Sequence, residues 1–102
     1  MKTYYVYILK CADDSFYVGV TNDIEKRVAG HNLGEDKKAY TFRRRPVELV
    51  WSEYYNDINQ AIEKEKQIKG WSRKKKQALI DGDFDLLVNL SKSKKNPSTS
   101  SG

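Results

Sequence analysis

The sequence predicts an α/β (α+β) fold: a small three-stranded, largely antiparallel sheet packed with helices in the order β-β-α-β-α-α-α. Three observations carry this prediction. Two runs of β-branched and aromatic residues open the chain, with only a short turn rich in Asp and Ser between them. A third such run follows a basic loop, and segments with helical caps and glycine stops surround it.

Strands are expected where apolar and β-branched residues continue without a breaker, over residues 4–10, 16–21 and 47–55. Residues 11–15 join the first two strands, and a connection this short favours an antiparallel hairpin. The third strand starts after Pro46, which closes the loop from Glu35 to Arg45.

Four helices are expected, over residues 24–32, 58–69, 73–80 and 84–90. Each follows a residue whose side chain can accept from the free N–H groups of the first turn: Asn22 or Asp23, Asp57, Ser72 and Asp83. A glycine after each of the first three marks the end of the helix: Gly34, Gly70 and Gly82.

A chain of 102 residues favours one domain, which we expect over residues 1–90. Residues 91–102 hold only Ser, Lys, Asn, Pro, Thr and Gly, so a disordered polar and basic tail is expected there. Cys11 is the single cysteine, which excludes an internal disulfide and a multi-cysteine zinc site. The chain has neither a signal-peptide core at its start nor an apolar run of roughly 20 residues. We therefore expect a cytoplasmic protein with no membrane contact.

Basic residues are concentrated in two stretches that contain no acid, and the net charge of the chain is +5. Aromatic residues alternate with the cations, a combination that suits phosphate contact and base stacking. A solvated surface would explain the same charges, and charge alone does not separate the two. The candidate nucleic-acid-binding residues are Lys37, Lys38, Arg43, Arg44, Arg45, Lys69, Arg73, Lys74 and Lys75.

Helical phase places two polar residues on the apolar side of the first helix. Ile24 and Val28 define its buried stripe, and Arg27 and His31 fall within that stripe at helical spacing. A charge on a buried stripe needs a partner, because an unpaired buried charge is strongly destabilising.

The second helix has the same feature. Its stripe is formed by Ile58, Ala61, Ile62 and Ile68, and Glu65 lies near the centre of it. Glu63 lies on the opposite side of the helix, towards solvent. Glu65 therefore either pairs with Arg27 or lines a cleft at the edge of the core.

Alternate residues of a strand share a face, which groups Tyr7 with Tyr5 and Leu9 on the first strand, and Tyr17 with Gly19 and Thr21 on the second. The missing side chain of Gly19 leaves a gap through which a ligand or backbone can approach. Taken singly, the two tyrosines could be core aromatics with a hydrogen-bonded hydroxyl, and His31 could be a surface histidine. Taken with Arg27 and Glu65, they point to an active site.

At these residues the chain resembles the GIY-YIG nuclease superfamily. The matching segments are Tyr5-Val6-Tyr7 and Tyr17-Val18-Gly19, followed by Arg27, His31 and the helical Glu65. Residues 44–50 and 68–73 look like a short stand-alone bacterial subfamily of endonucleases, related to the nuclease domain of a bacterial excinuclease. The resemblance covers roughly residues 4–90, and Tyr5 stands where the first family motif begins with Gly.

The resemblance implies a metal-dependent endonuclease that hydrolyses phosphodiester bonds in DNA, with structured or damaged DNA as the expected substrate and DNA repair as the setting. It implies that Glu65 binds one divalent metal, Mg²⁺ or Mn²⁺, and that Arg27 binds the phosphate. Tyr7, Tyr17 and His31 all remain candidates for the general base. DNA is expected as the partner before RNA, without an obligate protein partner. The alternative is a non-catalytic DNA- or RNA-binding module of the same fold.

Overall fold

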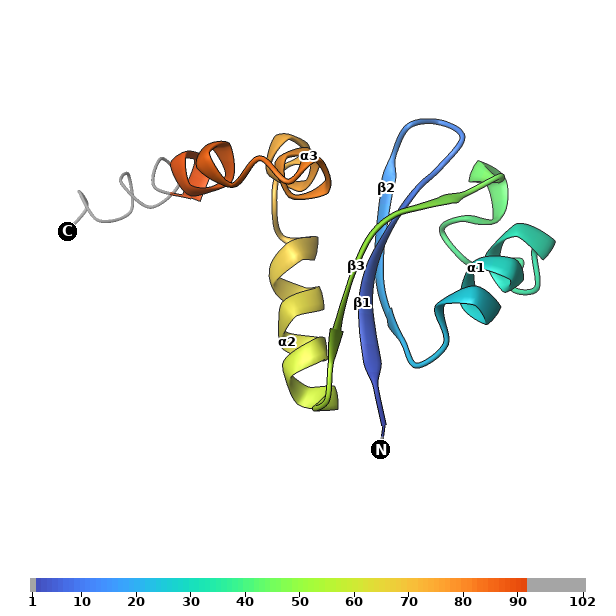
Figure 1. Cartoon of the computed structure of the whole chain (residues 1–102). Helices are drawn as coiled ribbons and strands as arrows, with labels where there is room; N and C mark the ends of the chain where they lie inside the picture. Colours follow the sequence, from blue (N-terminus) through green and yellow to red (C-terminus); the bar gives the residue numbers. More distant parts are fainter. Residues whose placement is uncertain (1, 92–102) are drawn as a thin grey trace. The chain divides into compact units, whose positions relative to one another are not determined.

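The computed structural model of the protein describes residues 2–91. Three antiparallel strands form one sheet in the order β2-β1-β3. The strands are β1 (Tyr4–Lys10), β2 (Phe16–Thr21) and β3 (Glu48–Tyr55). The predicted hairpin is confirmed, and β1 lies at the centre of the sheet because it pairs with both other strands (Figure 1).

The predicted helices are present as α1 (Ile24–Leu33), α2 (Ile58–Lys69), α3 (Arg73–Asp81) and a helix over residues 84–91. The element order therefore matches the predicted β-β-α-β-α-α-α. The side chains of Asp23, Asp57, Ser72 and Asp83 each accept a hydrogen bond from a first-turn N–H group, as expected. Gly34 and Gly82 adopt the left-handed conformation at φ 71°, which favours glycine.

Gly70 ends α2 in a different way. Its φ is −81°, within the ordinary right-handed region, and its N–H bonds back to carbonyls of the last helical turn. The chain divides into two compact units after this residue. Ser91, expected to begin the tail, is the last described residue of the final helix, and its hydroxyl donates to the carbonyl of Leu87 at 2.9 Å. The remainder of the predicted tail lies outside the described residues.

The strand β3 begins one residue later than predicted, and the side chain of Asn32 explains the shift. Its amide donates to the carbonyl of Val47 at 3.0 Å, and its carbonyl oxygen accepts from the Val47 N–H at 2.7 Å. Both backbone groups of Val47 are therefore satisfied by a side chain of α1 rather than by a neighbouring strand. This contact also ties the end of α1 to the start of β3.

Helices α1 and α2 cover opposite faces of the sheet (Figure 1). On the α1 side, Tyr7, Leu9, Cys11 and Val47 form a buried cluster. Tyr17 also packs on this cluster, so both tyrosines of the motif face α1. Neighbouring positions of β1 point to the other face, where α2 contacts β1 and β2.

The buried stripes are narrower than helical phase predicted. No residue of α1 is fully buried: Ile24 and Val28 are half-buried, and Arg27 is exposed. On α2 only Ala61 and Ile68 are buried, whereas Ile58 and Ile62 are each 37% exposed. A helix lying on a small sheet contacts it along a line rather than across the whole apolar arc, so the flanking isoleucines reach solvent.

Candidate active site

Tyr7 and Gly19 are paired across β1 and β2, and the shape of the site starts from this pair. The Tyr7 side chain is fully buried. A Cβ atom on residue 19 would lie 2.5 Å from the Tyr7 hydroxyl oxygen and 2.6 Å from its Cζ. The gap predicted at Gly19 is therefore real, but the Tyr7 ring itself occupies it.

The Tyr7 hydroxyl forms no hydrogen bond with any described residue, although it is buried. Burial raises the pKa of Tyr7 to about 12, with further increases from Tyr17 and Glu65, and Arg27 opposes this rise. Arg27 therefore lies close enough to act on the hydroxyl, although the two groups do not reach good hydrogen-bond geometry. Buried hydroxyls without a partner are uncommon and often mark a functional group.

His31 lies beside Tyr17 on the α1 side of the sheet. The two rings meet edge to face with centroids 5.2 Å apart, and the Tyr7 and Tyr17 centroids are 6.4 Å apart. The Nδ1 atom of His31 is 2.7 Å from the hydroxyl oxygen of Thr41, a fully buried residue. This contact sets the orientation of the imidazole ring.

The second ring nitrogen of His31, Nε2, is buried and has no hydrogen-bond partner among the described residues. Desolvation and the positive charge of Arg27 lower the pKa of His31, while Asp36 acts in the opposite direction. His31 is consequently neutral near pH 7, which is the form that can accept a proton.

Glu65 forms an ion pair with Lys69 rather than with Arg27. The Lys69 Nζ atom lies 2.6 Å from Oε2 of Glu65, one helical turn away on α2. The Glu65 side chain is only 15% exposed, which agrees with its predicted position near the core. Its charge nevertheless acts on Tyr7 across the sheet, where α2 packs beside the edge strand β2.

The five residues predicted for the site are thus close to one another. Tyr7 interacts with Tyr17, Arg27 and Glu65, and Arg27 also acts on His31. A cavity of about 390 Å³ opens next to Arg27 and His31, between α1, the residues that precede it and the loop that follows it. Tyr7, Tyr17 and Glu65 do not line this cavity, so it opens beside the Arg27 and His31 part of the site.

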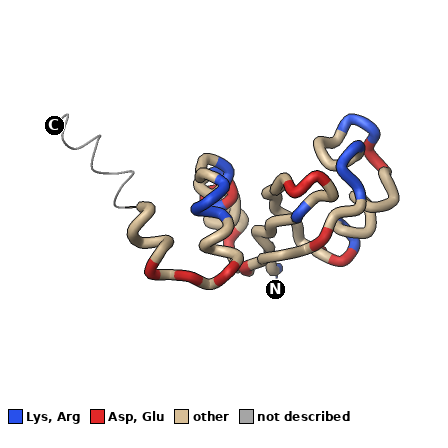
Figure 2. Tube along the Cα trace, turned by 90° about the horizontal axis from the view of Figure 1, so that it is seen from above, with Lys and Arg blue, Asp and Glu red and all other residues tan. Residues whose placement is uncertain are grey.

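The predicted cationic residues differ in what they contact. Along the described trace, lysines and arginines gather in stretches that are separated from the stretches with acidic residues (Figure 2). Lys37, Lys38, Arg43, Arg73 and Lys74 have exposed side chains, but Lys75 is buried with its Nζ 4.3 Å above the Trp71 ring. Burial against an aromatic ring makes Lys75 a poor candidate for direct phosphate contact.

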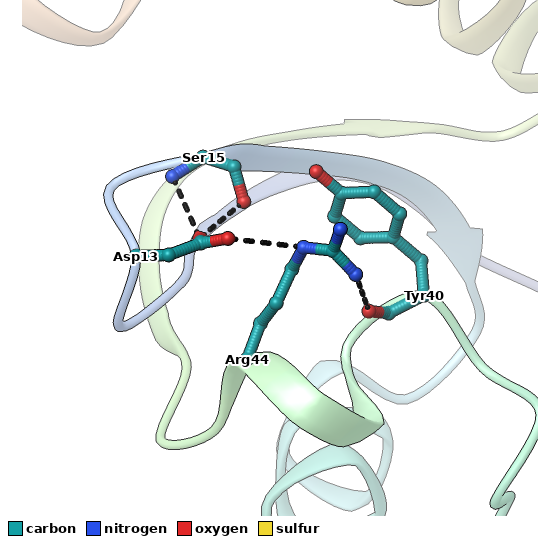
Figure 3. Close-up of polar contacts among 4 residues, drawn as sticks. All are labelled: Asp13, Ser15, Tyr40 and Arg44. Atoms are coloured by element: carbon teal, nitrogen blue, oxygen red, sulfur yellow. Dashed lines mark hydrogen bonds and ion pairs between the residues drawn. The ribbon is translucent and has the colours of Figure 1, made fainter.

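Arg44 holds the loop after α1 to the turn between β1 and β2 (Figure 3). Its Nε donates to Asp13 at 3.0 Å, and a terminal nitrogen donates to the carbonyl of Tyr40 at 2.7 Å. The guanidinium also lies 3.8 Å from the centre of the Tyr40 ring, and that ring stacks on Tyr17 at 6.1 Å. Arg44 therefore supports the aromatic wall of the site, which is formed by the stacked rings of Tyr40 and Tyr17. The position of Arg44 in a basic run did not indicate this contact.

Arg45 is likewise occupied within the loop. It donates to the carbonyls of Phe42 and Asn32 at 2.8 and 3.4 Å, and its guanidinium covers the Phe42 ring. Sequence reasoning also missed Thr41, which orients His31. No periodic pattern runs through this loop, so the sequence carries no signal for the burial of Thr41.

Comparison with known proteins identifies the family. The family model described as the GIY-YIG catalytic domain matches residues 3–78. The chain belongs to the GIY-YIG family. This confirms the resemblance drawn from the tyrosine motifs, and GIY-YIG domains form a nuclease superfamily, which implies that the chain binds nucleic acid.

Several relatives of this GIY-YIG chain are similar to it in sequence over most of their length. A UPF0213 protein of Staphylococcus saprophyticus is 48% identical over 80 residues, which cover 78% of this chain and 96% of the relative. A UPF0213 protein of Bacillus pumilus is 47% identical over 78 residues, covering 76% of this chain and 79% of the relative. The matched region therefore covers most of this chain and most of each relative.

Two solved structures resemble this GIY-YIG chain. The protein EF2693 from E. faecalis has a TM-score of 0.58 and 34% identity, covering 84% of this chain and 90% of that one. The UPF0213 protein BH0048 from Bacillus halodurans has a TM-score of 0.51 and 37% identity, covering 78% of this chain and 83% of that one.

None of the described helices is long and apolar enough to cross a membrane.

Proposed function

We propose that this chain is a metal-dependent endonuclease that hydrolyses phosphodiester bonds in DNA. The observation that carries the proposal is the buried hydroxyl of Tyr7, which has no hydrogen bond of good geometry with any described residue although Arg27 and Glu65 both act on it. A fold gains nothing in stability from a buried hydroxyl without a partner. A phosphate and a water molecule bound next to Arg27 would supply the missing hydrogen bonds.

Arg27 is the residue suited to hold the scissile phosphate. It is exposed and forms no ion pair with Glu65, and it faces the cavity beside α1. Its planar guanidinium can donate two parallel hydrogen bonds to phosphate oxygens. The same positive charge stabilises the negative charge that develops on the phosphoryl oxygens during attack.

His31 is the favoured proton acceptor. With a pKa of about 12 the Tyr7 hydroxyl is protonated near neutral pH and cannot take up a proton, so Tyr7 is better suited to orient the attacking water. His31 has a lowered pKa, a free ring nitrogen and an orientation set by Thr41. Tyr17, in contact with both rings, would align Tyr7 and His31 on the same water.

Glu65 is the residue that would hold the metal. The described residues contain no group of three or more His, Cys, Asp and Glu side chains that could surround an ion. In this proposal Glu65 supplies the protein ligand, and a single carboxylate suits Mg²⁺ or Mn²⁺ because these hard cations complete their coordination with water and phosphate oxygens. When bound, such an ion stabilises charge on the leaving oxygen.

The proposed substrate is structured or damaged DNA, bound through the exposed cations Lys37, Lys38, Arg43, Arg73 and Lys74. A non-catalytic binding module would use the same cations, so only a cleavage assay separates the two functions. The purified full-length chain would be incubated with Mn²⁺ and labelled duplex, branched, nicked and single-stranded DNA, with matched RNA alongside. We expect cleavage of at least one DNA form, and binding without any cleavage would favour the binding module.

Glu65→Gln is the decisive variant, and Glu63→Gln is its matched control on the exposed side of α2. Glutamine keeps the shape of the side chain but lacks the charge that a divalent cation needs. We expect Glu65→Gln to remain folded, to bind DNA as well as the wild type or better, and to lose cleavage. Full cleavage by a well-folded Glu65→Gln protein would exclude the metal-ligand role.

A further inference from the structure

The Lys69–Glu65 pair differs from an ordinary surface pair one helical turn apart. The Glu65 carboxylate is 15% exposed and the Lys69 side chain 53% exposed, so a mostly buried anion is neutralised from the solvent side. By comparison, the carboxylates that pair with Lys10 and Arg44 are 73% and 49% exposed. A buried carboxylate without a counter-charge is costly, so Glu65 needs a cation at all times.

Lys69 also lies close to a second residue of the site. The pKa of Lys69 is raised, first by its hydrogen bond to Glu65 and to a smaller extent by Tyr17. The ammonium group is therefore in contact with the Glu65 carboxylate and within electrostatic reach of Tyr17. Its four-carbon stem is flexible, and its exposed side leaves room for the group to move away.

We propose that Lys69 is a positioning residue that holds the Glu65 carboxylate in the metal-free protein. When the divalent cation binds, it replaces Lys69 as the partner of this carboxylate, and we call this replacement the exchange. This inference rests on the proposed function, in which Glu65 binds the metal. The two cations compete because a divalent ion on the Glu65 carboxylate would lie close to the Lys69 ammonium, which is 2.6 Å from Oε2, and the two positive charges repel each other. Once released, the ammonium remains beside the site, where it can contact phosphate.

The exchange has a measurable consequence, because competition for one carboxylate lowers the apparent affinity for metal. Removing the Lys69 charge should therefore tighten metal binding, whereas a purely structural ion pair would change stability alone. We would titrate the full-length protein with Mn²⁺ and follow paramagnetic broadening of the amide signals of α2 by NMR. The variants are Lys69→Met and Lys69→Gln, with Lys66→Met as the control because Lys66 is exposed on the same last turn.

We expect both Lys69 variants to bind Mn²⁺ roughly two- to fivefold more tightly than the wild type, the factor expected on losing a partly exposed ion pair. Lys66→Met should match the wild type, and Glu65→Gln should show no broadening centred on residue 65. Two Lys69 variants are used so that misfolding of one does not decide the result. Glutamine keeps a hydrogen-bond donor, and methionine keeps about the length of the lysine side chain.

The outcomes separate this inference from the proposed function. Unchanged or weaker Mn²⁺ binding by both Lys69 variants, with binding lost in Glu65→Gln, would overturn the exchange and leave Glu65 as the metal ligand. Wild-type Mn²⁺ binding in Glu65→Gln would overturn the ligand assignment itself, and the exchange with it.

Discussion

The hydroxyl of Tyr7 occupies the space that a side chain on Gly19 would fill, 2.5 Å from the position of the absent Cβ. The two residues are partners in the β1–β2 register, and the Tyr7 ring is fully buried. Glycine at position 19 therefore acts by leaving room for a neighbour. The tyrosine that it admits is the one on which Arg27 and Glu65 both act.

Gly19→Ala should destabilise the fold and abolish cleavage, because Tyr7 has to move to make room for the new methyl group. Overpacking of this kind costs about 1–3 kcal/mol in the free energy of unfolding, which chemical denaturation would measure. Gly70→Ala is the control, since its Cβ would come no closer than 3.6 Å to a heavy atom. An active Gly19→Ala protein of wild-type stability would show that the placement of the Tyr7 ring is not essential.

Tyr7→Phe should separate stability from activity. The hydroxyl has no partner in the described residues, so its removal should leave the free energy of unfolding unchanged or raise it by up to about 1 kcal/mol. Cleavage should fall roughly 100-fold or more, because water is no longer oriented. Tyr54→Phe, at an exposed tyrosine of β3, should alter neither property. A clear loss of stability in Tyr7→Phe would mean that the hydroxyl is hydrogen-bonded after all.

His31 should titrate below the ordinary histidine pKa of 6.5. It is the single histidine of the chain, so its ring proton signals can be followed by NMR without assignment. Arg27→Gln should raise this pKa by removing a positive charge, and Asp36→Asn should lower it further. Shifts of the opposite sign would contradict the arrangement of the three groups.

The same pKa shift sets a pH dependence of stability. A group whose pKa is lower in the folded than in the unfolded protein contributes stability that is fully present above its unfolded value, here 6.5. That contribution is lost as the pH falls through the folded value. The melting temperature should therefore fall on acidification below pH 6.5, and less steeply in His31→Gln than in the wild type.

Arg43 and Arg44 are neighbours in the sequence but should respond differently to substitution. Arg43 is exposed, so Arg43→Gln should keep its melting temperature, bind DNA more weakly and reduce the slope of log K against log salt by about one. Arg44→Gln loses its bonds to Asp13 and Tyr40 and should be destabilised by about 1 kcal/mol. Equal effects of the two variants on melting temperature and salt slope would show that the loop does not depend on Arg44.

The local features of this protein follow from the sequence alone. Strand alternation grouped Tyr17 with Gly19 on one face of the second strand, and the β1–β2 register brings Tyr7 opposite Gly19. Capping side chains set the start of each helix, because they satisfy backbone groups only a few residues away. The tyrosine motifs followed by Arg27, His31 and Glu65 also sufficed to indicate the family.

Tertiary structure decided which partner each polar group meets. Helical phase put Arg27 and Glu65 on apolar stripes and left an ion pair between them open, but Arg27 is exposed and Glu65 pairs with Lys69. Helical phase likewise did not indicate which isoleucines of α2 are covered by the small sheet and which reach solvent.

The loop after α1 shows the same limit. Arg44 supports Tyr40 and Thr41 orients His31, although the sequence offered only a basic run. The physical reason is the sequence separation of the groups that interact, because helix caps and strand faces depend on residues only a few positions apart along the chain. Burial and charge pairing depend instead on segments that only folding brings together.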